Sequence, residues 1–531
     1  MNFANRTCRL VSSAALLLLA AACASTPGGS GGAAQAPVAQ GQKPTLVVMI
    51  TVDQLRPDYL ERFKADLTRG FPRLLNRGAY FTNAHHDHAI TETAPGHATL
   101  LTGRFPRGTG ITRNIAGVNS SQYPLLVGIG QGAAPFRLRG TTLFDWMKAV
   151  TPQARALSVS AKDRSAILPV GREKQDVYWF TDDGYFTTST WYRQALPAWA
   201  ASFNQADPVR AYMGTTWDQT PGINFAEPDS VPVERGGRGF TYPHRFPGTR
   251  DSIGVAVRYS PMVDELIARF AWRGFRELDI GRGPGMDLLA VSFSATDYVG
   301  HTYGPESREV HDNMVRLDRV LGAFLDSLYS VRDSSRIVFA LSADHGVQKI
   351  PELHGGVRVS MRTAMVAARA LVRRHGGDTT AIDFESGGFF IDQEALVGGL
   401  TSRMLTDSFM VAARKVNGVM RVERFDALTR LDTLTDPIAR RWIHMFPDDI
   451  APTAVVTLRP GSIYAGNVAT HGTPHDEDSH VPLLFVGEAF APGRHDGFVR
   501  TVDLAATLAH ALGVRPLERL DGRVLVDAFR R

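Results

Sequence analysis

Four continuous runs of apolar, often β-branched residues recur along the chain, separated by long mixed stretches. The runs cover residues 45–53 (TLVVMITVD), 286–294 (MDLLAVSFS), 336–344 (RIVFALSAD) and 481–487 (VPLLFVG). Such runs, without polar alternation, are typical of strands buried on both faces of a parallel sheet. Helical periodicity lies between and after them, for example at 308–331 and 501–513. The alternation predicts an α/β domain with a mostly parallel central sheet flanked by helices.

Two segments interrupt this rhythm. Residues at about 165–280 are rich in Trp, Tyr, Pro and Gly, and residues at about 360–465 mix strand-like and helix-like stretches. We interpret both as insertions that form a cap over the sheet. A chain of 531 residues can bury one large core, so we predict a single domain over residues 45–531 that carries both insertions.

The N-terminal residues have the pattern of an export signal. Residues 1–23 combine a basic start, a short apolar run and small residues before Cys23. The apolar run is too short to span a bilayer. Together with the Gly-, Ala- and Pro-containing stretch at 24–44, it resembles a bacterial lipoprotein leader followed by a flexible tether. We therefore predict a periplasmic protein lipidated at Cys23; plain secretion is the alternative.

Cysteine content and charge exclude several functions. Cys8 and Cys23 are the only cysteines, so the mature domain has no disulfide and no thiol chemistry. Loss of a leader with two arginines and no acid would reduce the net charge from +5 to +3. This mild charge, with no dense basic run, does not favour nucleic-acid binding. No pattern indicates an oligomeric state.

Acidic and histidine residues follow three of the predicted strands. Asp53 and Asp344 stand at strand ends, and Asp297 comes shortly after a third strand. Sites in open α/β sheets form beyond the carboxyl ends of strands. Three aspartates at one edge would repel one another unless cations lie between them.

Histidines complete this pattern. His345 adjoins Asp344, His301 lies one helical turn after Asp297, and His471 occurs in the late segment "ATHGTPHDEDSH". Alone, each has an ordinary explanation as a turn or surface histidine. Together they predict a metal centre, and carboxylates with imidazoles but no cysteine favour zinc over manganese or iron.

Thr93, in "TETAPGHATLLTG", is a candidate nucleophile. A metal bound to its hydroxyl would favour the alkoxide at neutral pH. The segment also looks like a helix start with an early Pro95, where exposed N–H groups and the helix dipole favour a phosphate-like anion. The alternative, Thr93 as a helix N-cap, is compatible with this role.

These residues resemble the alkaline phosphatase superfamily, in its nucleotide pyrophosphatase/phosphodiesterase branch, and most of all the PafA-type alkaline phosphatases. The resemblance rests on five motifs in family order: "ITVDQLRPDYL", "TETAPGHATLLTGRFPRGTGI", "SATDYVGHTYGP", "SADHG" and "THG…DSHVPLLFVG". It implies a periplasmic hydrolase of small-molecule phosphate monoesters, with broad range, two zinc ions and a phosphothreonine intermediate. It would place the first zinc among Asp53, Thr93, Asp344 and His345, and the second among Asp297, His301 and His471.

The resemblance also implies residues that bind the substrate phosphate. The family's asparagine, twenty-one residues after the threonine, falls on Asn114, with Asn119 a weaker rival. The Lys-x-Arg pair of PafA-type monoesterases matches Lys162 and Arg164. Two extra cations would favour a doubly charged monoester over a singly charged diester; a solvated charged turn is the alternative reading.

Other histidines and other functions fit less well. We expect "HHDH" (85–88), His354, His475 and His480 to lie outside the metal centre. A sulfatase would need a Cys/Ser-x-Pro-x-Arg nucleophile segment, which "TAPGH" does not supply. A phosphodiesterase or nucleotide pyrophosphatase on the same scaffold, and a non-catalytic metal-binding lipoprotein, remain as alternatives.

Overall fold

The computed structural model describes residues 43–115 and 117–531. Cys23 and the predicted leader lie outside the described residues, as does the tether except for its last two residues. Along the described chain no helix is both long and apolar enough to cross a membrane.

A ten-stranded sheet forms the centre of the fold, in the order β17-β2-β16-β9-β1-β8-β3-β4-β5, with β18 beside β2. Its principal strands are β1 (Leu46–Val52), β2 (Ala79–His85), β3 (Ala156–Ser160), β4 (Asp176–Phe180), β8 (Asp287–Phe293), β9 (Ile337–Ser342) and β16 (His480–Val486). The edge strands β5 (Phe186–Thr187), β17 (Gly493–His495) and β18 (Val499–Arg500) are short. The pairs β9-β1, β1-β8, β8-β3 and β3-β4 are all parallel. The predicted mostly parallel α/β fold is confirmed.

The last predicted strand has the opposite direction. β16 pairs antiparallel with both β9 and β2. Six of its seven residues are buried, from Val481 to Val486. Burial on both faces produces the same apolar run whichever way a strand points, so the sequence pattern did not reveal its direction.

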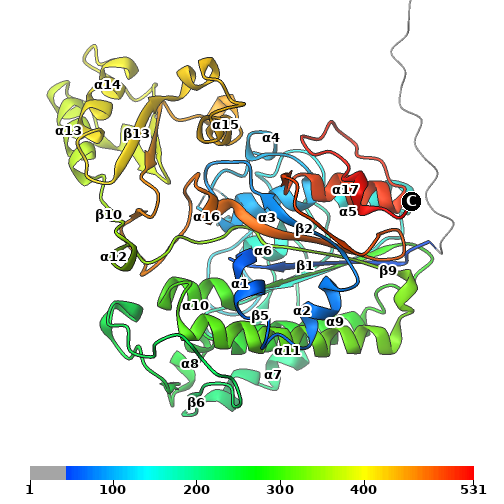
Figure 1. Ribbon diagram of the computed structural model, residues 1–531. Helices are drawn as coiled ribbons and strands as arrows, with labels where there is room; N and C mark the ends of the chain where they lie inside the picture. Colours follow the sequence, from blue (N-terminus) through cyan, green and yellow to red (C-terminus); the bar gives the residue numbers. More distant parts are fainter. Residues whose placement is uncertain (1–42, 116) are drawn as a thin grey trace, which may run out of the picture. The chain divides into compact units, whose positions relative to one another are not determined.

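Helices cover both faces because alternate residues of β1 point to opposite sides. Leu46, Val48, Ile50 and Val52 join a core with α9 (Met262–Glu277) and α11 (Arg308–Val331). Val47 and Met49 join a second core with α3 (Thr93–Thr102), α5 (Leu143–Val150) and α17 (Asp503–Leu512). Figure 1 shows α11 and α9 on one side of β1 and α3, α5 and α17 on the other.

Parallel pairing in register brings the carboxyl ends of the central strands to one edge. Val52 of β1 pairs with Phe293 of β8, and Thr51 pairs with Ser342 of β9. The residues that follow these strands therefore emerge together. That edge carries the candidate site.

The later segment has its own small sheet and core. The four-stranded antiparallel sheet β11-β12-β14-β13 comprises β11 (Ile382–Glu385), β12 (Gly388–Ile391), β14 (Ala454–Leu458) and β13 (Val419–Arg424). Helices α13 (Arg362–Arg374) and α14 (Ser402–Ala413) contribute to its core, and α15 (Pro437–Ile443) belongs to a smaller cluster. A parallel pair, β10 (Arg358–Val359) with β15 (Ile463–Tyr464), joins the two ends of this segment.

The earlier segment contributes to the main sheet as well as to its cover. β4 and β5 form the edge of the central sheet. Beyond them, α7 (Ala198–Gln205), the β6–β7 pair (Thr216–Trp217 with His244–Arg245) and α8 (Arg250–Arg258) precede α9. Further helices are the short α2 (Gly70–Leu75) and α6 (Asp163–Ile167), and α10 (Ala295–Tyr303), which follows β8.

Candidate active site

Three aspartates meet at the carboxyl edge of the sheet, as the sequence predicted. Asp53 follows β1, Asp344 lies two residues after β9, and Asp297 stands in the first turn of α10, which follows β8. The relative exposures of the three residues are 0%, 0% and 3%. Buried carboxylates at this density need nearby positive charge.

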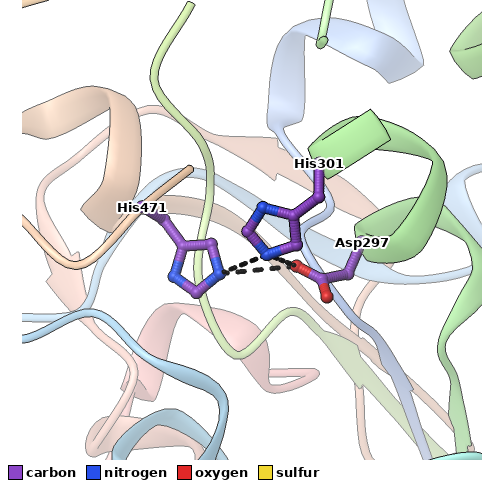
Figure 2. Close-up of side chains that lie close together, drawn as sticks. All are labelled: Asp297, His301 and His471. Atoms are coloured by element: carbon purple, nitrogen blue, oxygen red, sulfur yellow. Dashed lines mark hydrogen bonds and ion pairs between the residues drawn. The ribbon is translucent and has the colours of Figure 1, made fainter. Parts of the chain in front are cut away.

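One cluster joins α10 to the loop that carries His471 (Figure 2). His301 and Asp297 lie one turn apart on α10, with His301 Nε2 3.2 Å from Asp297 Oδ1. His471 Nε2 lies 3.4 Å from the same oxygen and 3.2 Å from His301 Nε2. The three atoms are close enough to share one ion.

Backbone carbonyls set the orientation of the histidines. His301 Nδ1 donates to the carbonyl of Ala469 at 2.8 Å, and His471 Nδ1 donates to that of Thr91 at 2.7 Å. With the proton on Nδ1, each Nε2 presents a lone pair. Two lone pairs and a carboxylate oxygen that face one another within 3.4 Å repel unless a cation binds them, so this donor set fits a divalent metal.

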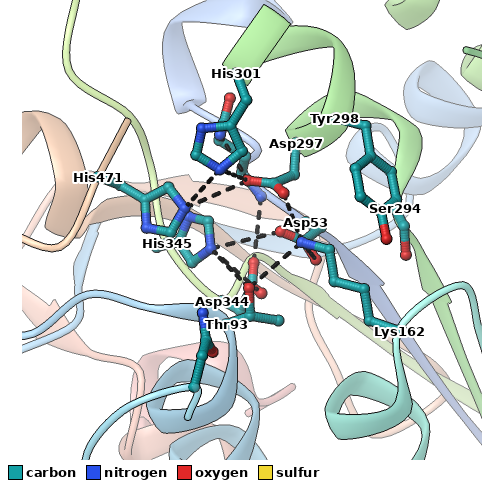
Figure 3. Close-up of polar contacts among 12 residues, drawn as sticks. Asp53, Thr93, Lys162, Ser294, Asp297, Tyr298, His301, Asp344, His345 and His471 are labelled. Atoms are coloured by element: carbon teal, nitrogen blue, oxygen red, sulfur yellow. Dashed lines mark hydrogen bonds and ion pairs between the residues drawn. The ribbon is translucent and has the colours of Figure 1, made fainter. Parts of the chain in front are cut away.

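A second cluster lies beside the first (Figure 3). His345 Nε2 is 3.5 Å from Asp53 Oδ1, 3.6 Å from Asp344 Oδ2 and 3.4 Å from Thr93 Oγ1. His345 Nδ1 donates to the carbonyl of Gly346 at 3.0 Å, so its Nε2 is again the free nitrogen. Asp53 Oδ1 accepts no hydrogen bond from a described residue, which also fits a bound cation.

Lys162 is the ammonium nearest these carboxylates. Its Nζ lies 2.7 Å from Asp53 Oδ2, 2.6 Å from Asp297 Oδ2 and 3.4 Å from Thr93 Oγ1. Burial and the Asp344 carboxylate raise the pKa of Asp53 above its usual range. Burial also opposes the charge of Asp297, but the imidazole of His301, when protonated, and the Lys162 ammonium outweigh it and hold the pKa of Asp297 below its usual range. One ammonium against three carboxylates leaves excess negative charge, which favours divalent cations.

Thr93 is the first residue of α3 and its side chain faces the second cluster. The N-cap position belongs to Glu92, whose backbone is extended, so the reading of Thr93 as an N-cap was wrong. The residue is buried, at 1% exposure. The hydroxyl is within 3.4 Å of both His345 Nε2 and Lys162 Nζ.

Asn114 lies against the first turn of α3. Its side-chain Oδ1 accepts from the N–H of Ala94 at 2.8 Å, and its backbone N–H donates to Glu92 Oε2 at 2.7 Å. The side chain is thus held next to Thr93. Asn119, the rival candidate, instead lines a cavity of about 230 Å³ that Lys162 also lines.

Arg164 is in the first turn of α6, two residues after Lys162. Its guanidinium pairs with Asp163 at 3.5 Å and, like Lys162, lines the cavity of about 230 Å³ next to Tyr298. Among the described residues its contacts include none to Thr93. The structure therefore brings Lys162 to the hydroxyl and leaves Arg164 at the adjoining cavity.

Comparison with known proteins agrees with this arrangement. The sequence pattern of the type I phosphodiesterase / nucleotide pyrophosphatase family matches residues 47–127 and 140–387. The chain belongs to this family.

Its full-length relatives within the type I phosphodiesterase family include alkaline phosphatases. The chain is 30% identical to the alkaline phosphatase PafA of Elizabethkingia meningoseptica, over 92% of this chain and 95% of that protein. It is 29% identical to the alkaline phosphatase PhoK of a Sphingomonas species, over 91% of each. A crystal structure of wild-type PafA matches with a TM-score of 0.84 at 27% identity, covering 92% of this chain and 99% of that one. The protein is a hydrolase of the alkaline phosphatase family.

Two buried residues of this family member escaped the sequence interpretation. His97, four residues after Thr93, places Nδ1 3.1 Å from Asp344 Oδ2 and 3.0 Å from the Thr93 carbonyl. Gln54 touches Asp297 and Asp344. Helical spacing from Thr93 could have indicated His97, whereas Gln54 has no signal beyond its position after Asp53.

The remaining histidines have other partners. The described clusters able to hold a metal include none of His85, His86 or His88. Asp87, in the same segment, pairs instead with Arg440 and Arg500. The others bind at separate places: His354 to Glu306, His475 to the Leu458 carbonyl and His480 to the Thr82 carbonyl.

Proposed function

We propose that this protein is a zinc-dependent phosphate monoester hydrolase that acts through a phosphothreonine at Thr93. The observation that supports it most is the position of the Thr93 hydroxyl. It lies within 3.4 Å of a free imidazole nitrogen of one ligand cluster and of the ammonium that links both clusters.

The residues that would hold the two zinc ions are those of the two clusters. Asp53, Thr93, Asp344 and His345 would hold one ion, and Asp297, His301 and His471 the other. Bound zinc supplies Lewis acidity, which favours the ionised threonine and stabilises charge on the leaving oxygen.

The reaction at Thr93 proceeds in two steps. In the first, Thr93 Oγ gives up its proton and bonds to phosphorus, the bond from phosphorus to the leaving oxygen breaks, and that oxygen takes up a proton and leaves as the alcohol. In the second, water bonds to phosphorus, the bond from phosphorus to Thr93 Oγ breaks, and a proton from the water restores the hydroxyl as inorganic phosphate leaves. The N–H of Thr93 at the start of α3, together with the side-chain NH₂ of Asn114, binds the non-bridging phosphate oxygens.

Lys162 and Arg164 favour monoesters in this proposal. A monoester carries a second negative charge on its non-bridging oxygens, where a diester carries an alkyl or aryl group. Cations placed near those oxygens therefore stabilise the monoester transition state more. Lys162 is within 3.4 Å of the nucleophile, and Arg164 lines the cavity that begins at Lys162.

The cellular location rests on sequence alone. The export pattern of residues 1–23 and the small residues before Cys23 support a periplasmic, lipid-anchored enzyme. Small-molecule phosphate esters are the expected substrates, and the lipid is the expected membrane attachment.

Phosphodiester hydrolysis is the second candidate, because the family pattern that matches this chain is named for that activity. The ratio of rates on an aryl phosphate monoester and the matching bis-aryl diester separates the two. A larger kcat/KM on the diester would overturn the monoesterase assignment.

Substitution of Thr93 tests the mechanism. Thr93→Ala should lower kcat on an aryl phosphate by at least about 10³-fold, since it removes the nucleophile. Thr93→Ser keeps a hydroxyl and should retain measurable turnover and an acid-stable phosphoenzyme in rapid-quench experiments. Near-wild-type turnover by Thr93→Ala would rule the mechanism out, and purified active protein without zinc would rule out the metal assignment.

A further inference from the structure

Gln54 occupies an unusual position directly after Asp53. It is completely buried, and its backbone lies in the left-handed region with φ of 66°. Residues other than glycine rarely adopt this conformation because it crowds the Cβ. Such strain persists where surrounding contacts fix it, and it concentrates at functional sites.

The contacts of Gln54 reach both candidate metal clusters. Its backbone N–H donates to Asp344 Oδ1 at 3.2 Å, and its side-chain Nε2 donates to Asp297 Oδ1 at 2.7 Å. Asp297 Oδ1 is the same oxygen that faces His301 and His471. A single residue therefore holds one aspartate of each cluster.

The close approach of α10 depends on Gly300. A Cβ at position 300 would lie 1.9 Å from Gln54 Oε1, and the three nearest atoms to it all belong to the Gln54 amide. Gly300 lies between Asp297 and His301 on α10. The helix that carries two candidate ligands is thus seated directly on the Gln54 side chain.

We propose that Gln54 is a positioning residue that fixes the separation of the two aspartates and so couples the binding of the two metal ions. This inference rests on the two-zinc site of the proposed function. Hydrogen-bond partners of metal ligands fix ligand orientation, and their loss commonly weakens metal binding by about 10–100-fold. Because Gln54 contacts both clusters, its loss weakens the binding of both ions and reduces the cooperativity of their binding.

Zinc binding to the purified full chain tests the proposal directly. Zinc is removed with a chelator, and the two Zn²⁺ dissociation constants are then measured by competition with a calibrated chelator. Gln54→Met keeps the side-chain length but removes the donor, so both constants should rise by about 10–100-fold. Gln54→Gly should have a similar effect on zinc while relieving the strained backbone.

Two readouts separate positioning from general structural damage. The melting temperature of the zinc-free variants should stay close to that of zinc-free wild type, while the increase on adding zinc becomes smaller. Gln348→Met is the matched control, because Gln348 is also completely buried but donates to the Thr473 hydroxyl at 3.3 Å. It should leave both zinc constants near their wild-type values.

A double-mutant cycle with Gly300 tests the contact itself. Gly300→Ala alone should weaken zinc binding, because the new Cβ displaces the Gln54 amide. In the Gln54→Gly background the clash is gone, so Gly300→Ala should have little further effect.

Each alternative outcome is decisive. Variants of Gln54 that bind both ions as tightly as wild type, a change in only one of the two constants, or additive effects in the cycle would each overturn the coupling role. A wild-type chain that binds no zinc would overturn the proposed function together with this inference.

Discussion

The carbonyl oxygen of Asp344 lies where a side chain at Gly96 would begin, since a Cβ on Gly96 would be 2.0 Å from that oxygen. The fourth residue of α3, the helix that begins at Thr93, therefore rests directly on the backbone of a candidate metal ligand. This contact sets the distance from Thr93 to Asp344 and His345. The close contact between α3 and Asp344 is possible only because residue 96 is glycine and has no side chain.

Gly96→Ala should therefore damage catalysis although it changes no reactive group. The added methyl group cannot enter without moving α3 or the loop after β9, because the atom it meets is main chain. We expect a loss of about 1–3 kcal/mol of stability, as for overpacking in cores, and a fall in kcat/KM of at least about 100-fold. Kinetics on an aryl phosphate and thermal unfolding measure the two effects.

Gly497→Ala is the control for this substitution. A Cβ at position 497 meets nothing within 4 Å, so activity and melting temperature should match wild type. A Gly96→Ala enzyme with unchanged kcat/KM would show that α3 can shift without consequence.

The double variant Lys162→Ala/Arg164→Ala should lose monoesterase activity far more than diesterase activity. Each cation near the phosphate contributes most where the second negative charge develops, and charge-assisted contacts are worth about 1.5–3 kcal/mol. The ratio of kcat/KM on the monoester to that on the diester should fall by at least about tenfold. Equal losses on both substrates would contradict the specificity role.

Arg373→Ala/Arg374→Ala removes the same number of charges from the end of α13. Both arginines are exposed, so this control should leave the ratio unchanged. This control separates the effect of the local contacts of Lys162 and Arg164 from the effect of the protein's net charge on the substrate.

Asp264 should make stability depend on pH. This buried side chain accepts from the N–H groups of Ser294 and Ala295 at 2.8 and 3.1 Å, at the start of α10. Burial raises the pKa of Asp264 to about 7, although these N–H groups oppose the change. From about pH 4 to 7 the unfolded chain ionises while the folded chain stays protonated, so the stability of wild type falls as pH rises through this window.

Asp264→Asn keeps an acceptor for α10 and removes the ionisation. It should be more stable than wild type at pH 8, by on the order of 2–4 kcal/mol, and lose this advantage near pH 4.5. Unfolding in urea at the two pH values measures the difference. Asp264→Ala, which also removes the acceptor, should be less stable at pH 4.5 by about 1 kcal/mol. An Asn variant no more stable at pH 8 than at pH 4.5, relative to wild type, would contradict the assignment.

The small sheet β11-β12-β14-β13 is linked to Glu92, the residue before Thr93, through Ser386. Its hydroxyl donates to Glu92 Oε1 at 2.5 Å, while Glu92 Oε2 accepts from the N–H of Asn114 at 2.7 Å. Ser386→Ala should loosen Glu92 and hence Asn114. We expect the inhibition constant of inorganic phosphate to rise by about fivefold, corresponding to one hydrogen bond, with kcat changed less.

Ser360→Ala is the control, because Ser360 lines the same cavity of about 460 Å³ as Glu92 and Ser386. The described contacts of its hydroxyl go to the N–H of Arg362 rather than to Glu92. Phosphate inhibition should be unchanged in this variant. An equal rise in both variants would show that the cavity wall, rather than Glu92, governs phosphate binding.

The sequence revealed the main sheet and the edge that bears the site for a physical reason. Asp53 and Asp344 follow strands buried on both faces, and parallel strands in register end together, so these carboxylates had to meet. The helix at 308–331 formed with the predicted bounds, because a long amphipathic period depends little on distant contacts.

What the sequence concealed depends on contacts between remote segments. Gln54 meets its two aspartate partners across 243 and 290 residues, and a lone glutamine beside an apolar run carries no periodic signal. The strand at 481–487 was located, but its direction depends on β9 and β2, the two remote strands between which it lies. Thr93 was a plausible N-cap by residue type, whereas the backbone assigns that position to Glu92.

Main-chain carbonyls, at Ala469, Thr91 and Gly346, aim the three histidines of the site. A carbonyl is present whatever residue occupies a position, so these three hydrogen bonds do not themselves specify a side chain. The Thr91 hydroxyl has a separate role, because it binds the N–H of Gly472 at 3.2 Å and the carbonyl of Thr473 at 3.0 Å and so holds the loop that carries His471. The orientation of the candidate metal ligands is thus set partly by the backbone conformation of the loops. Gly472, next to His471, has a φ of 102°, which favours glycine. Its replacement would change the backbone conformation of this loop and misorient His471, although every candidate ligand would still be present in the sequence.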